Sequence, residues 1–343
     1  MNFASDNAWG AAPEMLEALL SANKSAAAPY GEDALSMRLA AVMSRIFERP
    51  VFAFPVISGT AANGLALATV VPPHGAVFCH ELAHIATDEC GAPGFFTHGA
   101  TLVPLDGRNG MLEPGPLGRA LERSCRGDVH HAQPAAVSIT QATECGTCYR
   151  PDAISAIAEL AHRHRMKLHM DGARFANAIA HLGCSPAEAT WKAGVDVLSF
   201  GATKNGALGA EAVVFFDRGD VRDFEFRRKK SGHLTSKMRF LSAQLLCALE
   251  QDRWLAWAAR ANALAARLAA DLTKFPWADI AYPVETNAVF VFLPDAVVAR
   301  LRESGAHFYD WREAAEGRTL VRLVTSCLTP EAEIDAFLAI ARG

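Results

Sequence analysis

A lysine and an aspartate stand directly after apolar runs that predict buried strands. Asp171 ends the run "KLHMD", and Lys204 lies in "SFGATKNG" among small residues instead of on a charged helix face. A lysine that loses its proton on burial can attack a carbonyl group and form a Schiff base. An acid at a strand end can pair with a cationic ring nitrogen, and Arg174, three residues on, can bind a carboxylate bidentately. A structural aspartate–arginine turn would use the same two residues.

Two further motifs have the residue types that bind anions. Ser58-Gly59-Thr60 stand where a predicted strand passes into a helix, so backbone N–H groups and the helix dipole would receive a phosphate there. An ordinary capped helix start uses the same residues. Arg322 interrupts the apolar strand "TLVRLVTSC", and a charge in a buried strand requires an anionic partner, for example a substrate. The spacing of a P-loop is absent, which disfavours a nucleoside triphosphate.

The stretch "HELAH" matches the zinc-binding pattern of metallopeptidases at His80 and His84. That pattern binds zinc only when both histidines lie one turn apart on a helix and a third ligand comes from elsewhere. Here the apolar run "GAVFC" reaches His80, so we expect His80 at a strand end, off any shared helix face. Thr87 also stands where the extended pattern requires glycine. We therefore predict no metal site and keep a zinc peptidase as a remote alternative.

Strands and helices alternate through the first two thirds of the chain. Each predicted strand is a short apolar run bounded by Gly or Pro. Strands are expected at residues 50–56, 75–80, 99–105, 134–140, 167–171, 196–200 and 210–216. Helices are expected at residues 59–71, 151–165 and 175–181. This alternation predicts an α/β fold in which helices cover both faces of a mostly parallel, seven-stranded type of sheet.

The character of the chain changes near residue 242. A long Ala- and Leu-rich helical stretch is expected over residues 242–274, followed by strands in "NAVFVFL" and "LVRLVTSC" and by a last helix. This order predicts a smaller C-terminal α+β domain attached by a long helix. We expect an N-terminal arm and large domain over residues 1–245, and the small domain over residues 246–343.

Composition and charge exclude several classes of protein. The formal net charge is -4, and basic residues are scattered apart from residues 227–230, so no surface for nucleic acid is expected. No apolar run is long enough to span a bilayer, and the start of the chain has no signal-peptide pattern. Eight dispersed cysteines are typical of a reducing compartment. We therefore expect a cytoplasmic enzyme.

Taken together, the motifs resemble a known group of enzymes. A pyridoxal phosphate enzyme acting on an amino acid requires a phosphate-binding helix start, an acid, a lysine and carboxylate-binding arginines. We call the helix start at Ser58-Gly59-Thr60 the phosphate cup. The order of these groups is similar to that of the aspartate-aminotransferase-like superfamily, fold type I. Seven stretches narrow the resemblance to the low-specificity L-threonine aldolases of the β-eliminating lyase group: Ser5-Asp6, "APYGED", "SGTAANGLALA", "AHIATDECGAP", "TQATECGTCY", "LHMDGAR" and "LVRLVTSC".

The resemblance implies a role for each matching residue. Lys204 would form the Schiff base with pyridoxal 5'-phosphate, Asp171 would pair with the pyridine nitrogen, and His84 would stack on the ring, with Glu89 as a neighbour. Cofactor contacts are implied for Ser58, Gly59, Thr60, His84, Asp171, Arg174, Thr203, Lys204 and, as a looser match, Arg239. Substrate contacts are implied for Ser5, Tyr30, Arg174 and Arg322.

The implied reaction is aldol cleavage of L-threonine, L-allo-threonine and related 3-hydroxy amino acids, such as phenylserine, to glycine and an aldehyde. His84, directly or through a water, would remove the β-hydroxyl proton; a satisfied histidine at a strand–helix junction is the alternative. Some members carry a histidine where this chain has Gln141-Ala142-Thr143-Glu144. The resemblance therefore does not identify the residues that contact the substrate hydroxyl group, or the preference between threonine and allo-threonine. A pyridoxal-phosphate-dependent β-elimination is the alternative activity.

The expected partners follow from the same resemblance. A small amino-acid substrate is expected, without nucleic acid or membrane. Relatives imply a homotetramer built from dimers with shared active sites, in which Tyr30 and residues 227–230 would reach a neighbouring subunit's cofactor. A non-catalytic binding protein is disfavoured, because binding alone does not require Lys204 beside an acid and a phosphate cup.

Overall fold

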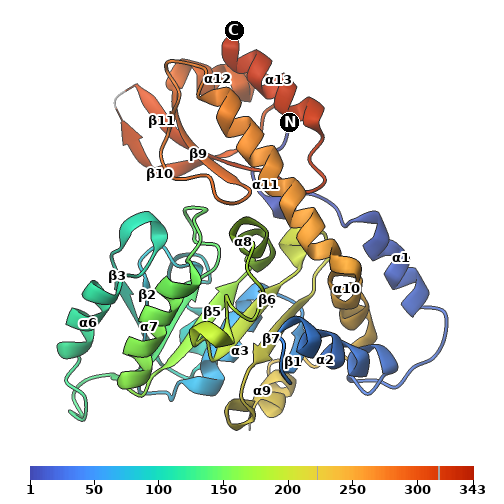
Figure 1. Ribbon diagram of the computed structural model, residues 1–343, viewed down its shortest axis with the longest axis vertical. Helices are drawn as coiled ribbons and strands as arrows, with labels where there is room; N and C mark the ends of the chain where they lie inside the picture. Colours follow the sequence, from blue (N-terminus) through green and yellow to red (C-terminus); the bar gives the residue numbers. More distant parts are fainter. Residues whose placement is uncertain (222, 316) are drawn as a thin grey trace.

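The chain folds around two β-sheets of unequal size (Figure 1). A computed structural model describes residues 1–221, 223–315 and 317–343. The large sheet contains β1 (Phe52–Val56), β2 (Gly75–His80), β3 (Thr101–Leu105), β4 (Gln133–Thr140), β5 (Lys167–Gly172), β6 (Val197–Gly201) and β7 (Glu211–Phe215). The small sheet contains β8 (Asp279–Ile280), β9 (Ala288–Pro294), β10 (Tyr309–Ala315) and β11 (Arg318–Val324).

Helices pack around both sheets, and one long helix runs from the large sheet to the small one (Figure 1). The first group is α1 (Pro13–Ala22), α2 (Ala34–Ile46), α3 (Gly59–Val70), α4 (His84–Thr87), α5 (Ala92–Phe96), α6 (Pro114–Glu122), α7 (Pro151–Arg163) and α8 (Phe175–Leu182). The second group is α9 (Phe224–Lys230), α10 (Arg239–Leu249), α11 (Arg253–Leu272), α12 (Asp295–Glu303) and α13 (Glu331–Arg342). None of the helices in these described residues is both long and apolar enough to cross a membrane.

The large sheet is mostly parallel, which confirms the predicted fold class. Its strand order is β1-β7-β6-β5-β4-β2-β3. β3, β2, β4, β5 and β6 pair in parallel, whereas β7 pairs antiparallel with both β6 and β1. The antiparallel pair needs no crossover helix, so a short connection joins β6 to β7. Lys204 lies in that connection, at the edge of the sheet where the parallel strands end.

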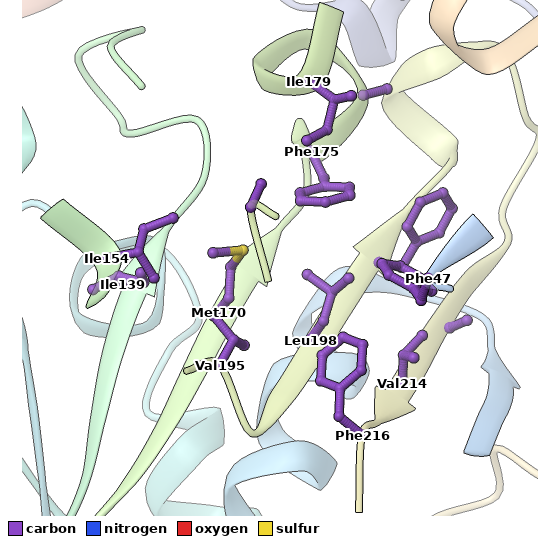
Figure 2. Packing of buried hydrophobic residues seen from close by; sticks show 14 of the residues in the cluster. Phe47, Ile139, Ile154, Met170, Phe175, Ile179, Val195, Leu198, Val214 and Phe216 are labelled. Atoms are coloured by element: carbon purple, nitrogen blue, oxygen red, sulfur yellow. The ribbon is translucent and has the colours of Figure 1, made fainter. Parts of the chain in front are cut away.

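Successive residues of the central strands point to opposite faces of the large sheet, and both faces are covered. Val197 and Val213 belong to a hydrophobic cluster with α3. Leu198 and Val214, their neighbours in the chain, belong to the larger cluster on the opposite face, which includes residues of α7 and α8 (Figure 2). Strands buried on both faces need apolar residues at nearly every position, which explains the unbroken apolar runs of the sequence.

The small sheet has the order β10-β11-β9-β8, and all its pairs are antiparallel. Val289 and Val291 of β9 pack in a cluster with α11 and α13, together with Phe3 from the start of the chain. Ala288 and Phe290, which alternate with them, point to the other face and line the cavity described below. One face of the small sheet therefore packs against the helices α11 and α13, and the other face lines the cavity.

The helical stretch predicted over residues 242–274 is present, but it is not one continuous helix. The stretch forms two helices, α10 and α11, separated by a turn in which Gln251 has a φ of 59° and Asp252 a φ of 53°. These left-handed conformations interrupt the helical hydrogen bonds and redirect the chain. Trp254 of α11 still belongs to the large hydrophobic cluster, whereas Leu264 belongs to the small one, so α11 connects both units. The division at residues 245 and 246 stays a prediction.

Candidate active site

A cavity of about 400 Å³ lies between the carboxyl edge of the large sheet and the face of the small sheet that carries Ala288 and Phe290. Ligands of open α/β sheets bind at this edge, because the loops after parallel strands converge there. Eight of the predicted contact residues line the cavity: Ser5, Gly59, Thr60, His84, Asp171, Arg174, Lys204 and Arg322. The fold thus brings together residues from the start, the middle and the end of the chain.

Asp171 lies near the end of β5 and is 3% exposed. Its Oδ1 accepts a hydrogen bond from the Ala173 N–H at 3.0 Å, and its Oδ2 accepts one from Asn63 Nδ2 at 2.8 Å. The same Asn63 nitrogen donates to Glu89 Oε1 at 2.9 Å. One amide on α3 therefore holds two buried carboxylates in place, and it fixes the direction of Asp171 toward the cavity.

His84 is the first residue of α4, and its imidazole is oriented by an acid. Nδ1 lies 2.8 Å from Glu89 Oε1, and this hydrogen bond raises the pKa of His84 above its ordinary value, although burial opposes the shift. The contact leaves Nε2 available for a ligand. The predicted neighbourhood of His84 and Glu89 is present in the structure.

The two histidines of "HELAH" do not share a helix. His80 is the last residue of β2, and both of its ring nitrogens contact backbone groups: Nε2 lies 2.9 Å from the Gly107 carbonyl, and Nδ1 accepts from the Leu82 N–H at 3.0 Å. His84 begins a separate short helix after a turn. The geometry that a zinc peptidase requires is therefore not formed by these residues.

Lys204 lies in a single turn of 3-10 helix (Thr203–Asn205) between β6 and β7. Gly206 closes that turn with a φ of +90°, a conformation that favours glycine, and a Cβ there would lie 3.2 Å from Ala12 Cβ. Burial, followed by the charge of Arg174, lowers the pKa of Lys204. A lysine that releases its proton more easily is a better nucleophile toward a carbonyl carbon.

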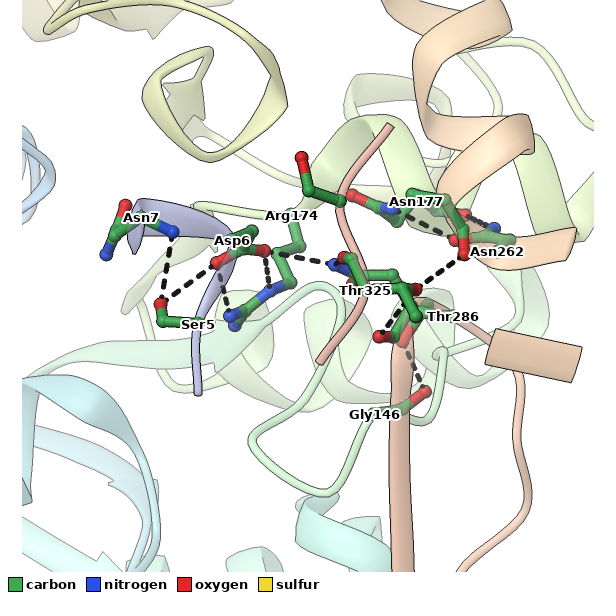
Figure 3. Close-up of polar contacts among 12 residues, drawn as sticks. Ser5, Asp6, Asn7, Gly146, Arg174, Asn177, Asn262, Thr286 and Thr325 are labelled. Carbon is green, nitrogen blue, oxygen red and sulfur yellow. Dashed lines mark hydrogen bonds and ion pairs between the residues drawn. The ribbon is translucent and has the colours of Figure 1, made fainter. Parts of the chain in front are cut away.

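Arg174 is held by an acid that the sequence motifs did not assign to the site. Its Nε and Nη2 donate to Asp6 Oδ2 at 2.7 Å and to Asp6 Oδ1 at 2.9 Å (Figure 3). Burial acts to raise the pKa of Asp6, but the charges of Arg174 and Lys204 and the hydrogen bonds from Arg174 and Asn287 together outweigh it, and the pKa lies below its ordinary value. Because Asp6 occupies two of the three guanidinium nitrogens, Nη1 is the one left for another ligand.

Arg322 reaches the cavity from β11. Its guanidinium carbon lies 5.3 Å from the ring centroids of both Tyr309 and Trp311, and its Nη2 donates to the Ala4 carbonyl at 3.3 Å. Burial, followed by the charge of Arg174, lowers the pKa of Arg322. Its Nε is buried and finds no hydrogen-bond partner among the residues that the structure describes. A partly buried cation with one unpaired donor favours an anionic ligand.

The start of α3 meets the cavity at Gly59 and Thr60. Ser58 is the N-cap, and its hydroxyl accepts from the Ala61 N–H at 3.3 Å. The first N–H groups of a helix have no partner within the helix, so those of Gly59 and Thr60 remain for an anion. A Cβ added at Gly59 would meet nothing within 4 Å, which shows open space at the helix start.

Four predicted contact residues do not line this cavity. Ser58 is the cap of α3, and the Thr203 hydroxyl accepts from the Ala210 N–H at 3.2 Å. Tyr30 is 46% exposed on the surface, with Lys229 Nζ 4.5 Å from its ring centroid. Arg239 Nε donates to the Ala22 carbonyl at 3.2 Å. The proposed contacts of these residues stay predictions.

The remaining polar atoms at the cavity show what kind of ligand fits it. Asn63 Oδ1, Glu89 Oε2 and Glu144 Oε2 are buried and lack hydrogen-bond partners within the described residues. The cavity therefore combines a helix start, a strand-end carboxylate, a lysine of lowered pKa and two arginines. This set of groups fits pyridoxal 5'-phosphate together with an amino acid. The cofactor needs partners for its phosphate, its ring nitrogen and its carbonyl carbon, and the amino acid needs one for its carboxylate.

Asp6, Asn63 and Glu144 are the site residues that the sequence motifs did not assign. Each of them lies inside a quoted stretch of the sequence, and Asp6 is next to Ser5, which was assigned. Asp6 and Asn63 are mostly buried and act on the site through Arg174 and Asp171. The only signal available beforehand was a polar residue in an otherwise small or apolar segment.

Comparison with known proteins agrees with this geometry. The family model described as "Beta-eliminating lyase" matches residues 2–296. A low specificity L-threonine aldolase of a Pseudomonas species is 43% identical over 342 residues, covering 99% of this chain and 97% of the relative. The low specificity L-threonine aldolase of Pseudomonas aeruginosa is 45% identical over 308 residues, covering 90% and 88%.

Solved structures agree as well. The Leishmania major threonine aldolase superposes with a TM-score of 0.93 at 26% identity, covering 99% of this chain and 98% of that one. A Listeria monocytogenes structure described as a putative L-allo-threonine aldolase reaches a TM-score of 0.76 at 17% identity, which shows the shared fold. Enzymes of the matched family depend on pyridoxal phosphate. This chain belongs to the beta-eliminating lyase family.

Proposed function

We propose that this protein uses pyridoxal 5'-phosphate to cleave L-threonine, L-allo-threonine and related 3-hydroxy amino acids, such as phenylserine, to glycine and an aldehyde. The observation that carries the proposal is the meeting of Lys204, Asp171 and His84 with Arg174 and Arg322 in one cavity. The names of the Pseudomonas relatives support the same activity.

Each part of the cofactor has a matching group in the chain. When bound, the cofactor supplies a ring that withdraws electrons from the bonds at the substrate Cα. Lys204 Nζ would hold the carbonyl carbon, and Asp171 would keep a proton on the ring nitrogen. The N–H groups of Gly59 and Thr60 would hold the phosphate, and the His84 imidazole would lie against the ring.

Two arginines from different parts of the fold would bind the substrate carboxylate. Arg174 follows β5 of the large sheet, and Arg322 lies on β11 of the small sheet. Asp6 leaves Nη1 of Arg174 for the ligand, and Arg322 Nε lacks a partner in the described part of the chain. Ser5, next to Asp6, lines the same region. A carboxylate fixed at two points orients the Cα–Cβ bond for cleavage.

The proposal is tested by analysing products. The purified protein is loaded with pyridoxal 5'-phosphate and incubated with L-threonine, L-allo-threonine or phenylserine, and glycine and aldehyde are measured. Equal amounts of glycine and aldehyde are expected. A keto acid with ammonia would instead identify a β-elimination, and the absence of any product from all three amino acids would refute the proposed substrates.

We also propose that the active form is a homotetramer built from dimers with shared active sites. Exposed apolar side chains on α1, α2 and the connection from β6 to β7 support an interface: Leu20 is 70% exposed, Met37 64% and Leu208 58%. Tyr30 and residues 227–230 would reach the cofactor of a neighbouring subunit. Sedimentation velocity of the active protein tests the proposed assembly, because an active monomer would contradict the tetramer.

A cytoplasmic location is part of the same proposal. It rests on eight cysteines dispersed along the chain, as in proteins of reducing compartments. Cell fractionation with an antibody against the protein tests the location, and recovery outside the cytoplasm would contradict it.

A further inference from the structure

Glu144 is an acid at the cavity with an unusual hydrogen-bond environment. It lies in the loop after β4 and lines the cavity. Its Oε1 accepts hydrogen bonds from the His84 N–H at 2.8 Å and from the Thr140 hydroxyl at 3.0 Å. Its Oε2 is buried and has no partner among the described residues. A buried oxygen without a donor is a costly place for negative charge, so it is a favourable place for a proton.

The other acids at or next to the cavity differ from Glu144 in their partners or in their exposure: Asp88 and Asp310 also line the cavity, but both are exposed to solvent. Asp6 forms an ion pair with Arg174, and Glu89 forms one with His84. Asp171 accepts hydrogen bonds from two N–H groups and lines the cavity. In the part of the chain that the structure describes, no ion pair joins Glu144 to a cation. Unlike Asp171, which accepts a hydrogen bond on each oxygen, Glu144 has one oxygen, Oε2, that is left to take a proton.

Burial, and after it the charge of Asp171, raises the pKa of Glu144 to about 7. The ionisable groups around it are Cys79 on β2, Tyr149 in the same loop, Asp171 on β5, Arg174 after that strand and His84 on α4. A group that takes up and releases a proton near neutral pH is suited to act as a general base.

His84 is less suited to that task. Its hydrogen bond to Glu89 raises the pKa of the imidazole, which favours the doubly protonated ring. An imidazolium donates from both nitrogens and cannot accept a proton. A doubly protonated His84 would donate from Nε2 to the substrate, and Glu144 would then take the hydroxyl proton.

We propose that the carboxylate of Glu144 accepts the proton of the substrate β-hydroxyl group when the Cα–Cβ bond breaks. The O–H bond breaks, its electron pair forms the second bond of the aldehyde carbonyl, and the Cα–Cβ electron pair stays with Cα. The proton moves to Glu144. The reaction balances when a proton is added at Cα to give glycine and Glu144 returns its own proton to solvent. This inference rests on the proposed aldol cleavage.

The test compares two reactions of the loaded enzyme. Glu144→Gln keeps the shape of the side chain and removes its ability to accept the proton. We expect kcat/KM for L-threonine to fall about 100-fold or more, the usual effect of losing a general base. Exchange of the glycine Cα hydrogen with deuterated water involves no hydroxyl group, so it should stay within about 3-fold of the wild type. Glu144→Asp should restore part of the cleavage.

Glu285→Gln is the matched control. Glu285 Oε2 accepts from the Cys148 N–H at 2.6 Å, so it holds the same loop without lining the cavity. We expect this variant to change both reactions little. Glu144→Gln with cleavage close to the wild type would overturn the inference. A parallel loss of cleavage and exchange would also overturn it, because that pattern indicates a role in positioning.

A measurement independent of turnover uses infrared spectroscopy of the full chain during a pH titration. The difference between wild type and Glu144→Gln should contain a protonated-carboxyl band that disappears as the pH rises through about 7, the pKa of Glu144. The absence of such a band would overturn the inference. If the wild type makes no glycine and aldehyde, the proposed function fails, whereas failure of the Glu144 variants alone leaves that function intact.

Discussion

Replacement of Asp6 by alanine tests how the start of the chain supports the site. The Asp6 side chain is fully buried, and its two oxygens accept from Arg174 at 2.7 and 2.9 Å and from Asn287 Nδ2 at 3.1 Å. Asp6→Ala removes these contacts, together with a hydrogen bond from the Ser5 hydroxyl at 3.4 Å, and leaves the Arg174 guanidinium without its counter-charge. The N-terminal arm would also lose an anchor to the large unit.

The expected loss follows from the burial of the pair. Removing one partner of a buried ion pair costs about 3–5 kcal/mol of stability. The Arg174 side chain keeps 19% of its exposure, so water recovers part of the loss, and we expect about 3 kcal/mol. The free energy of unfolding in urea measures this. Lys274→Ala is the control, because Lys274 is 73% exposed and pairs with Asp271, and exposed pairs contribute about 1 kcal/mol or less.

The same pair predicts the direction of the pH dependence. Because the pKa of Asp6 lies below its ordinary value of 3.8, its stabilisation is fully present above that pH and is lost as the pH falls through the lowered pKa. The difference in unfolding free energy between the wild type and Asp6→Ala should therefore become smaller only in strong acid, below pH 3.8. An Asp6→Ala protein that loses less than about 1 kcal/mol at neutral pH would refute this reasoning.

Three further variants test the site. Lys204→Ala should abolish threonine cleavage and the visible absorption of bound cofactor, and retained cleavage would show that Lys204 does not hold it. His84→Phe should keep the visible absorption, because an aromatic ring would still lie against the cofactor. Its rate of threonine cleavage should fall less than that of Glu144→Gln, and a larger fall in His84→Phe would favour His84 as the base. Asn63→Leu removes the donor shared by Glu89 and Asp171 and should cost about 1–3 kcal/mol of unfolding free energy and weaken cofactor binding; unchanged values would contradict the shared-donor geometry.

The parts of the site that could be predicted from sequence lie at strand ends. Asp171 and Lys204 follow apolar runs, and such runs identify parallel strands buried on both faces. The carboxyl ends of these strands meet at one edge, so the two residues were expected to lie together, and both line the cavity. His80 was correctly expected to belong to a strand, since the run before it is apolar up to that residue.

The contacts that sequence could not predict join segments far apart in the chain. Asp6 reaches Arg174 across 168 positions, and Asn63 reaches Asp171 across 108. No local pattern specifies such pairs, because they depend on how the N-terminal arm and α3 pack on the sheet. The helix break at Gln251 and Asp252 was missed for a related reason, since neither residue is a strong helix breaker and packing decides the turn.

The most direct test of the central claim is to identify the lysine that holds the cofactor. The protein is loaded with pyridoxal 5'-phosphate and reduced with borohydride, which makes the link to the amine permanent, and its peptides are analysed by mass spectrometry. The label is expected on Lys204, with none on the Lys204→Ala variant. A label on another lysine, or on the variant to the same extent, would contradict the proposed site.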